Sequence, residues 1–115
     1  MAVTLATLAL AAPAQSAGLA KTTLTIRADG LDLSGKVKSP RSGCLGNRTV
    51  KVYKQAGSEQ KPATDSVIGS DTSQRQGNVG EWSTGNSGIS GKVYARTGKT
   101  AGCKGDSSET IRARR

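Results

Sequence analysis

The stretch that decides the fold is Gly77-Asn78-Val79-Gly80-Glu81-Trp82-Ser83-Thr84, a glycine-rich turn that leads into a short run typical of a β-strand. Trp82 is the only tryptophan in a chain of 115 residues that has two tyrosines and no phenylalanine. An indole carries more apolar surface than any other side chain in this sequence, so we expect Trp82 to anchor the core. The other strands are expected to pack around it.

Alternation of apolar and polar residues recurs along the chain, with turn signals between the alternating segments. The first segment, Leu24 to Ala28, precedes Asp29-Gly30, a two-residue hairpin signal that predicts Ala28 opposite Leu31. Further strands are predicted at residues 31–38, 48–54 and 65–71, around Trp82, and at residues 90–96 and 107–114. We therefore expect one all-β domain, a seven-stranded antiparallel sandwich of the immunoglobulin-like kind.

Residues 1–20 are expected to form a secretory signal peptide. The leading segment Met1 to Ala12 is apolar and uncharged, and it is too short to span a bilayer. Small residues at Ala12 and Ala14 predict cleavage after Ala14, with cleavage after Ala17 as the other choice. No Lys or Arg precedes the apolar run, so a hydrophobic first strand or helix remains an alternative. Residues 21–115 would then be a single secreted domain, extracellular or at the cell surface.

Cys44 and Cys103 are the only two cysteines of the chain. In an exported protein, an even pair far apart in the sequence indicates a structural disulfide, whereas a metal site would need more ligands. Closing a loop of about 60 residues would contribute roughly 4 kcal/mol by the loop-entropy argument. A domain with few bulky apolar residues depends on such a bond.

The composition excludes several functions. The chain has 17 basic and eight acidic residues, a net charge of +9, and such a domain attracts anionic polymers. It has no histidine, so the usual general base and the commonest metal ligand are missing. We expect neither an enzyme nor a bound cofactor or metal.

The order of several short motifs resembles a known group of domains. These motifs are Gly35-Lys36-Val37, the strand Asn47 to Tyr53, Asp71 ahead of Gly77 to Trp82, and Gly91-Lys92-Val93-Tyr94-Ala95. Together they resemble the carboxypeptidase-regulatory-like, or transthyretin-like, β-sandwich domain, over about Leu24 to Ile111.

This resemblance implies that Trp82 takes the place of a core aromatic of the group, and that Val93 stands where the group often has tyrosine. The disulfide-tied variety found in exported bacterial proteins is the most similar, with Cys44 and Cys103 each leading a strand. The group consists in general of non-catalytic accessory or surface modules. Some members form a Lys to Asn bond beside a buried acid, but no buried Asp or Glu can be identified in this sequence.

Acidic residues do not form a convincing site. The near neighbours in sequence are Asp29 with Asp32, Asp65 with Asp71, and Asp106 with Glu109. Turn and edge positions account for these pairs, and calcium binding by Asp65 and Asp71 lacks the dense acidic loop of such sites. The pattern Asn47-Arg48-Thr49 is a glycosylation acceptor that matters only under eukaryotic secretion. The basic C-terminal residues 111–115 alternate as a strand does and match no nucleic-acid motif.

The stronger functional prediction concerns the outer face of one sheet. If the strands at residues 48–54, 90–96 and 107–114 are neighbours, seven residues share an exposed face: Lys51, Tyr53, Lys92, Tyr94, Arg96, Arg112 and Arg114. Cations and tyrosines together suit an anionic cell-wall polymer, a glycan or a host polyanion. The alternative is a solvated basic face with no ligand.

We therefore expect a non-catalytic secreted or envelope-associated binding or structural module. A small secreted inhibitor or effector that acts through the polar loop Ala56 to Thr64 is the second hypothesis.

Overall fold

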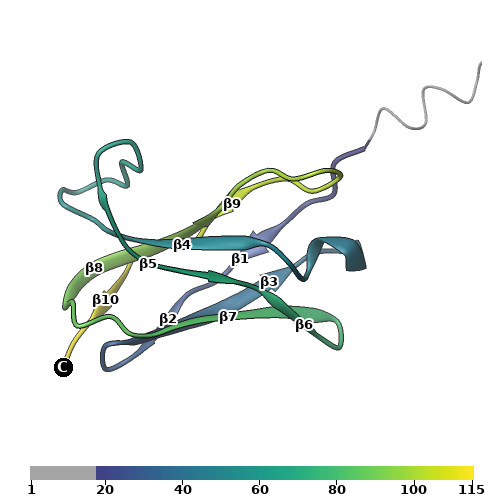
Figure 1. Ribbon diagram of the computed structural model, residues 1–115. Helices are drawn as coiled ribbons and strands as arrows, with labels where there is room; N and C mark the ends of the chain where they lie inside the picture. Colours follow the sequence, from purple (N-terminus) through teal and green to yellow (C-terminus); the bar gives the residue numbers. More distant parts are fainter. Residues whose placement is uncertain (1–17) are drawn as a thin grey trace, which may run out of the picture.

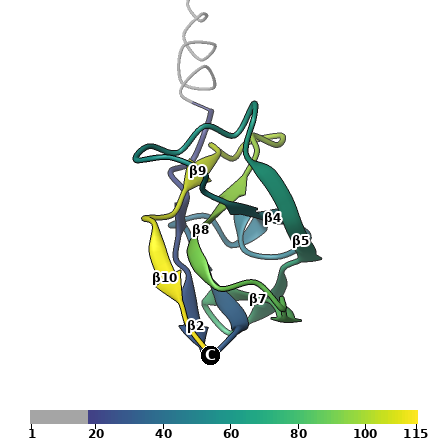
Figure 2. The same cartoon turned by 90° about the vertical axis from the view of Figure 1, so that its left-hand side faces the viewer.

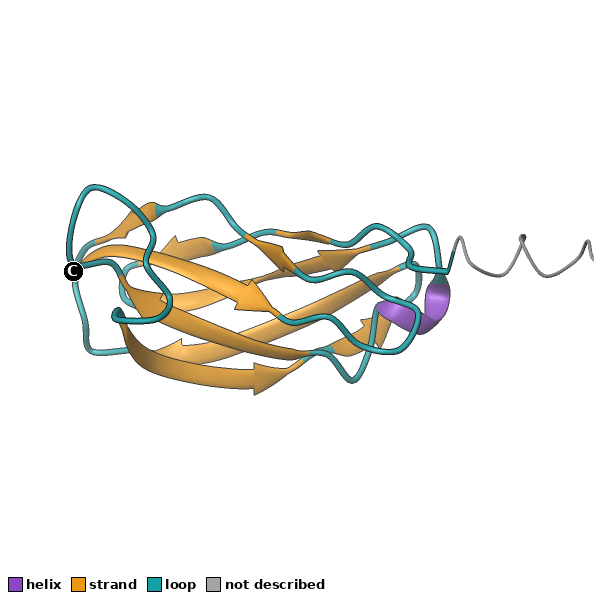
Figure 3. Cartoon of the chain, turned by 90° about the horizontal axis from the view of Figure 1, so that it is seen from above, coloured by secondary structure: helices purple, strands orange, loops and turns teal. Residues whose placement is uncertain are grey.

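The computed structural model describes residues 18–115, so most of the predicted signal peptide, with both predicted cleavage positions, lies outside the described residues. The described residues form two antiparallel sheets that pack face to face (Figure 1). One disulfide is present among them. The predicted all-β, disulfide-bonded sandwich is confirmed. Seen from above, the strands run along the long dimension of the domain, with the C terminus at one end and residue 18 at the other (Figure 3).

The first sheet has the strand order β1-β3-β7-β6, and β2 also pairs with β3. Its strands are β1 (Thr23–Leu24), β2 (Arg27–Asp29), β3 (Asp32–Lys38), β6 (Gln74–Gln76) and β7 (Val79–Asn86). The central strands β3 and β7 are far apart in sequence, so this sheet depends on long-range pairing.

The second sheet has the strand order β10-β8-β4-β5, and β9 also pairs with β8. Its strands are β4 (Thr49–Lys54), β5 (Ser66–Thr72), β8 (Gly91–Thr97), β9 (Asp106–Ser107) and β10 (Ile111–Ala113). The predicted neighbourhood of the strands now labelled β4, β8 and β10 is confirmed. Figure 2 shows β10 beside β2, where the edges of the two sheets meet.

Ten strands are present in residues 18–115, against the seven predicted. The first predicted strand is divided into β1 and β2 at Thr25, and the last is divided into β9 and β10 at Ser108. At Ser108 the side-chain Oγ accepts the Ala95 amide at 2.8 Å, so a hydroxyl takes the place of a backbone acceptor. The one added strand, β6, lies between the strands predicted at residues 65–71 and around Trp82, where no strand was predicted.

The predicted register of the first hairpin is wrong by two residues. Ala28 lies opposite Leu33, and Asp29 lies opposite Asp32. The two loop residues are therefore Gly30 and Leu31, and Gly30 takes the left-handed conformation, with φ of 63°. This register lets Leu31 bury its side chain in the core from the turn itself.

Trp82 is buried, as predicted, with 2% of its surface exposed. The turn before it is a two-residue hairpin at Gly77-Asn78 that joins β6 to β7, and Gly77 has φ of 65°. The indole packs among aliphatic side chains from both sheets. The other members of the core cluster are Leu24, Ile26, Leu31, Leu33, Val37, Val50, Val52, Val93, Ala95 and Ala113.

The disulfide end of the domain includes the residues just after the predicted signal. Cys44 and Cys103 are bonded, with 5.7 Å between their Cα atoms, which confirms the predicted pairing. Ala20 lies beside Cys103 in a parallel bridge, in which the Ala20 amide donates to the Gly102 carbonyl and the Ala20 carbonyl accepts from the Lys104 amide. The Gly18 carbonyl accepts from Arg41. The folded part therefore includes Gly18 to Ala20, which the sequence prediction grouped with the leading segment.

Candidate functional site

The strand registers bring the predicted basic residues of the second sheet onto one side. Lys51 on β4 lies directly opposite Arg96 on β8, and Tyr53 lies opposite Tyr94. On the other side of β8, Arg112 of β10 lies opposite Lys92. The buried residues Val50, Val52 and Val93 alternate with these residues and face the other sheet. The alternation of apolar and polar residues thus predicted correctly which side chains of the second sheet face the core and which lie on its outer side.

Tyr94 is not exposed, so the prediction that it lies on the exposed basic face is wrong. Its side chain is fully buried, although it lies on the outer side of the sheet. The segment between β4 and β5, residues 55–65, contacts the Tyr94 hydroxyl through Asp65. This segment is the teal loop at the upper left of Figure 1. The ring stacks on Tyr53, with 5.1 Å between ring centroids and 7° between planes. Only Tyr53, which is half-buried, remains available at the surface.

Asp65 fastens this loop to Tyr94. The Tyr94 hydroxyl donates to Asp65 Oδ2 at 2.7 Å, and the carboxylate also accepts the amides of Lys61 at 2.9 Å and Ala56 at 3.2 Å. The hydrogen bond from Tyr94, followed by the one from the Lys61 amide, lowers the pKa of Asp65. Burial, followed by the contact with Asp65, raises the pKa of Tyr94. At neutral pH the pair is a carboxylate that accepts from a phenol, which holds the loop but leaves no poised acid or base.

Polar side chains fix the same loop to β8 and to the segment before β10. Gln60 Nε2 donates to the Ser108 carbonyl and to Thr110 Oγ1, both at 2.9 Å. Lys92 Nζ donates to the Gly57 carbonyl. The ammonium of Lys92 is therefore engaged in holding the loop, and the loop itself is tied down along its length.

What remains of the predicted basic face is divided into two parts. The first is a hollow of about 330 Å³ lined by Thr49, Lys51, Tyr53, Arg96, Thr97 and Gly98. The second is a shallower hollow of about 470 Å³ lined by Ser90, Gly91, Arg112, Ala113, Arg114 and Arg115. The loop 55–65 and Lys92 lie between them, so the seven predicted residues do not form one continuous surface.

The first hollow concentrates positive charge. Lys51 is exposed and Arg96 is partly exposed, and no acidic residue lines this hollow. Like charges directly opposite on neighbouring strands repel each other. Arg96 Nε donates to Ser107 Oγ of β9 at 2.9 Å, on the side of β8 away from Lys51, so the hydrogen bond orders the guanidinium without neutralising it. Within residues 18–115 the one ion pair is Lys36 with Glu81 on the other sheet, so neither cation is neutralised by the described chain.

Arg48 was not recognised as a buried residue. Only 1% of its surface is exposed, and its guanidinium donates to Thr22 Oγ1 and to three backbone carbonyls, those of Cys44, Gly98 and Lys104. Burial lowers the pKa of Arg48. No pattern in the sequence distinguishes it from a surface arginine at the start of a strand. It ties three segments together at the disulfide end, next to both cysteines.

Asp65 and Asp71, near neighbours in the sequence, do not come together as a site. Asp65 holds the loop, whereas Asp71 accepts the Ser83 amide at 2.7 Å on the other sheet. No group of three or more Cys, Asp or Glu side chains in the described part of the chain is placed to hold a metal ion. Asp65 is also the buried acid that the sequence did not reveal.

Comparison with models of known protein families and with curated proteins found no match for this chain. In residues 18–115 no helix is long and apolar enough to cross a membrane.

Proposed function

We propose that this protein is a non-catalytic, exported binding module that holds an anionic polymer at Lys51 and Arg96. The observation that carries the proposal is the direct opposition of these two cations across β4 and β8, with no acid in the hollow they line. An anionic group placed between them would relieve their repulsion and gain two charge-assisted hydrogen bonds. Tyr53 lies beside the pair and offers a ring for a sugar or a base.

Export and a bacterial origin are part of the proposal. The leading apolar segment, the disulfide Cys44–Cys103 and the motif order that resembles the transthyretin-like domain support them. Both predicted cleavage positions, after Ala14 and after Ala17, retain Gly18 and its contact with Arg41. The module would then meet anionic wall polymers, glycans or host polyanions outside the cell, where its net charge of +9 aids encounter.

An inhibitor or effector that acts through the loop Ala56 to Thr64 is the second candidate. Side chains in and next to this loop make hydrogen bonds to the rest of the domain. Gln60 donates to Thr110, and Asp65, the residue after the loop, accepts from Tyr94. Deletion of the loop would uncover Tyr94 and disturb the fold, so the test must leave the loop in place. Substitution of the exposed Ser58 and Glu59 serves this purpose.

The experiment is a salt series of binding to inorganic polyphosphate and to dextran sulfate, with neutral dextran as the reference. We expect affinity to fall as salt rises, because exposed charges are screened over about 10 Å at 0.1 M salt. The double variant Lys51→Glu/Arg96→Glu should lose at least about tenfold in affinity, or about 1.4 kcal/mol.

The matched control is Lys21→Glu/Lys38→Glu, which changes the net charge equally at two exposed positions near β1 and β3. If both double variants lose affinity to the same degree, the attraction is a property of the whole charge and no site exists at Lys51 and Arg96. Affinity that does not change with salt also rejects the proposal.

A further inference from the structure

A further hollow lies over the first sheet, which is the opposite sheet from the basic face. It has a volume of about 650 Å³, within the ~300–1,000 Å³ range of small-ligand sites. Strands β3 and β7 and the segment between β1 and β2 supply most of its lining. Gln74 and Gln76 of β6 line it at the edge of the first sheet, and Asp71 of β5 lines it from the neighbouring edge of the second sheet.

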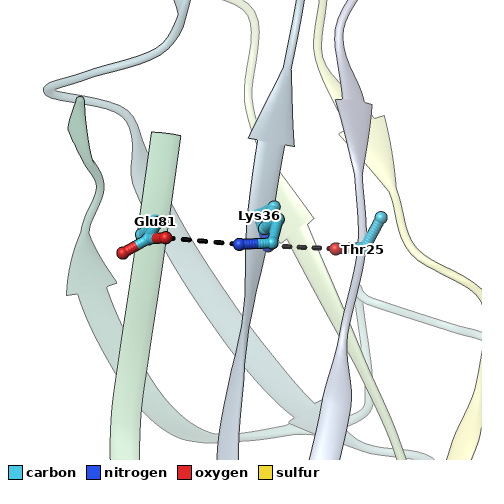
Figure 4. A network of polar contacts seen from close by, with 3 residues as sticks. All are labelled: Thr25, Lys36 and Glu81. Carbon is cyan, nitrogen blue, oxygen red and sulfur yellow. Dashed lines mark hydrogen bonds and ion pairs between the residues drawn. The ribbon is translucent and has the colours of Figure 1, made fainter. Parts of the chain in front are cut away.

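The hollow has a simple cause in the sequence. Ser34 on β3 lies directly opposite Ser83 on β7, so two small side chains meet on the outer face of the sheet. Two residues further along each strand, Lys36 lies opposite Glu81 on the same outer face. These side chains are much longer than the serines, so the serine pair lies at the bottom of a hollow. Lys36 Nζ donates to Glu81 Oε2 at 3.2 Å, and the Lys36 amide donates to Thr25 Oγ1 at 3.0 Å, which makes a row of polar contacts from β7 through β3 to the segment between β1 and β2 (Figure 4).

The charge of this groove differs from that of the rest of the protein. Its lining contains two basic residues, Arg27 and Lys36, and two acidic residues, Asp71 and Glu81, so their charges sum to zero. The chain as a whole carries +9. A groove of zero net charge does not attract a polyanion electrostatically. The hydroxyl groups of a neutral ligand can donate to the acidic residues of this groove and accept from its basic residues.

Several polar groups in the groove are free to bind a ligand. Asp71 accepts the Ser83 amide with Oδ2, and no donor in residues 18–115 contacts its Oδ1. Three other lining residues have exposed side chains that make no hydrogen bond within residues 18–115: Arg27, Gln74 and Gln76. Planar carboxylate, amide and guanidinium groups each present two atoms at once, which suits adjacent hydroxyls on a sugar ring.

From this arrangement we propose that the groove over Ser34 and Ser83 binds a neutral saccharide. The serine hydroxyls form the floor, the Lys36–Glu81 pair forms one wall, and Asp71 with Gln74 forms the other side. This site is independent of the Lys51–Arg96 hollow, which lies on the other sheet. The protein would then hold an anionic chain on one face and an uncharged glycan on the other.

The test uses the protein from residue 18 to residue 115. The ligands are a panel of neutral hexasaccharides built of glucose, mannose, galactose and N-acetylglucosamine. The Trp82 indole is buried on the inner face of this sheet, so binding is measured by calorimetric titration and not by tryptophan fluorescence. We expect at least one neutral hexasaccharide to bind, with an affinity that does not vary with salt. Ser34→Gln should fill the groove and lower this affinity at least about tenfold.

Ser58→Gln is the matched control, because it makes the same change at an exposed position in the loop 55–65. The Lys51→Glu/Arg96→Glu variant should bind the neutral saccharide as the wild type does, which separates this site from the proposed anion site. The inference is overturned if no member of the panel binds, if Ser34→Gln binds as tightly as the wild type, or if binding falls as salt rises.

Discussion

The indole Nε1 of Trp82 donates to the backbone carbonyl of Thr25 at 3.2 Å, across the inner face of β3. To reach the indole, this carbonyl leaves the ladder between Thr25 and Lys36. The Thr25 hydroxyl takes its place and accepts the Lys36 amide at 3.0 Å, while the Thr25 amide still donates to the Lys36 carbonyl at 3.0 Å. The division of the first strand into β1 and β2 thus follows from the hydrogen bond of a single core side chain.

Gly35 is the residue that permits this contact, and Gly35→Ala should be strongly destabilising. A Cβ at Gly35 would lie 1.9 Å from the Thr25 carbonyl oxygen and 2.7 Å from Trp82 Nε1. Neither the backbone nor the buried ring can move without cost, so we expect a loss of about 3 kcal/mol in the free energy of unfolding. Urea unfolding followed by Trp82 fluorescence measures it. Gly57→Ala, where nothing lies within 4 Å of the new Cβ, is the control and should be nearly neutral.

Thr25→Val should cost about 1 kcal/mol, because it removes the hydroxyl that accepts the Lys36 amide but keeps the shape of the side chain. Thr25→Ser keeps the hydroxyl and should lose less. The two variants are compared by chemical unfolding. A loss in Thr25→Val that is no greater than the loss in Thr25→Ser would mean that the Oγ1 contact does not contribute.

The Tyr94–Asp65 contact predicts how stability changes with pH. The pKa of Asp65 is lower in the folded state than its unfolded value of about 3.9, so its contribution is complete above about pH 4 and is lost as pH falls through the folded pKa. The pKa of Tyr94 is raised, so its contribution is complete below about pH 10 and is lost as pH rises through the folded pKa.

Thermal unfolding between pH 2 and pH 11 tests this. Asp65→Asn should flatten the acid side of the profile relative to the wild type, whereas Asp29→Asn, at an exposed hairpin position, should not. An unchanged acid limb in Asp65→Asn would show that other carboxylates cause the loss. Tyr94→Phe should lower stability at neutral pH by about 2 kcal/mol, since it removes a hydrogen bond to a charged group.

Arg48 is predicted to be as important for stability as the core. Arg48→Met leaves the carbonyls of Cys44, Gly98 and Lys104 without their donor, and we expect a loss of about 3 kcal/mol. Arg48→Lys supplies one ammonium in place of the planar fork and should recover only part of this loss. Lys99→Met, which changes an exposed cation at the same end of the domain, is the comparison. If Arg48→Met is as stable as Lys99→Met, the buried guanidinium does not hold the three segments together.

The sequence predicted the features that depend on local alternation and on rare residues. The inward rows of valines, the burial of Trp82 and the Cys44–Cys103 bond all follow from such patterns. Alternation states which side of a strand a residue faces, but it does not state what covers that side. For this reason Tyr94 was placed on the correct face and was still expected to be exposed.

The remaining differences involve contacts between segments distant in sequence. The buried position of Arg48 depends on carbonyls contributed by residues 44, 98 and 104, and the burial of Asp65 depends on Tyr94, which lies 29 residues away. The groove over Ser34 and Ser83 depends on the register between β3 and β7. None of these arrangements has a period or a motif that a single sequence can display.

The most direct test of the Lys51–Arg96 site is a two-dimensional NMR titration of the domain with short-chain polyphosphate. We expect the largest changes in chemical shift at Lys51, Arg96 and Gly98, around the hollow that lacks an acidic residue. We expect smaller changes at Arg112 and Arg114, on the far side of the loop 55–65. Changes that are largest at those two arginines, or spread evenly over all exposed cations, would contradict an anion site between Lys51 and Arg96.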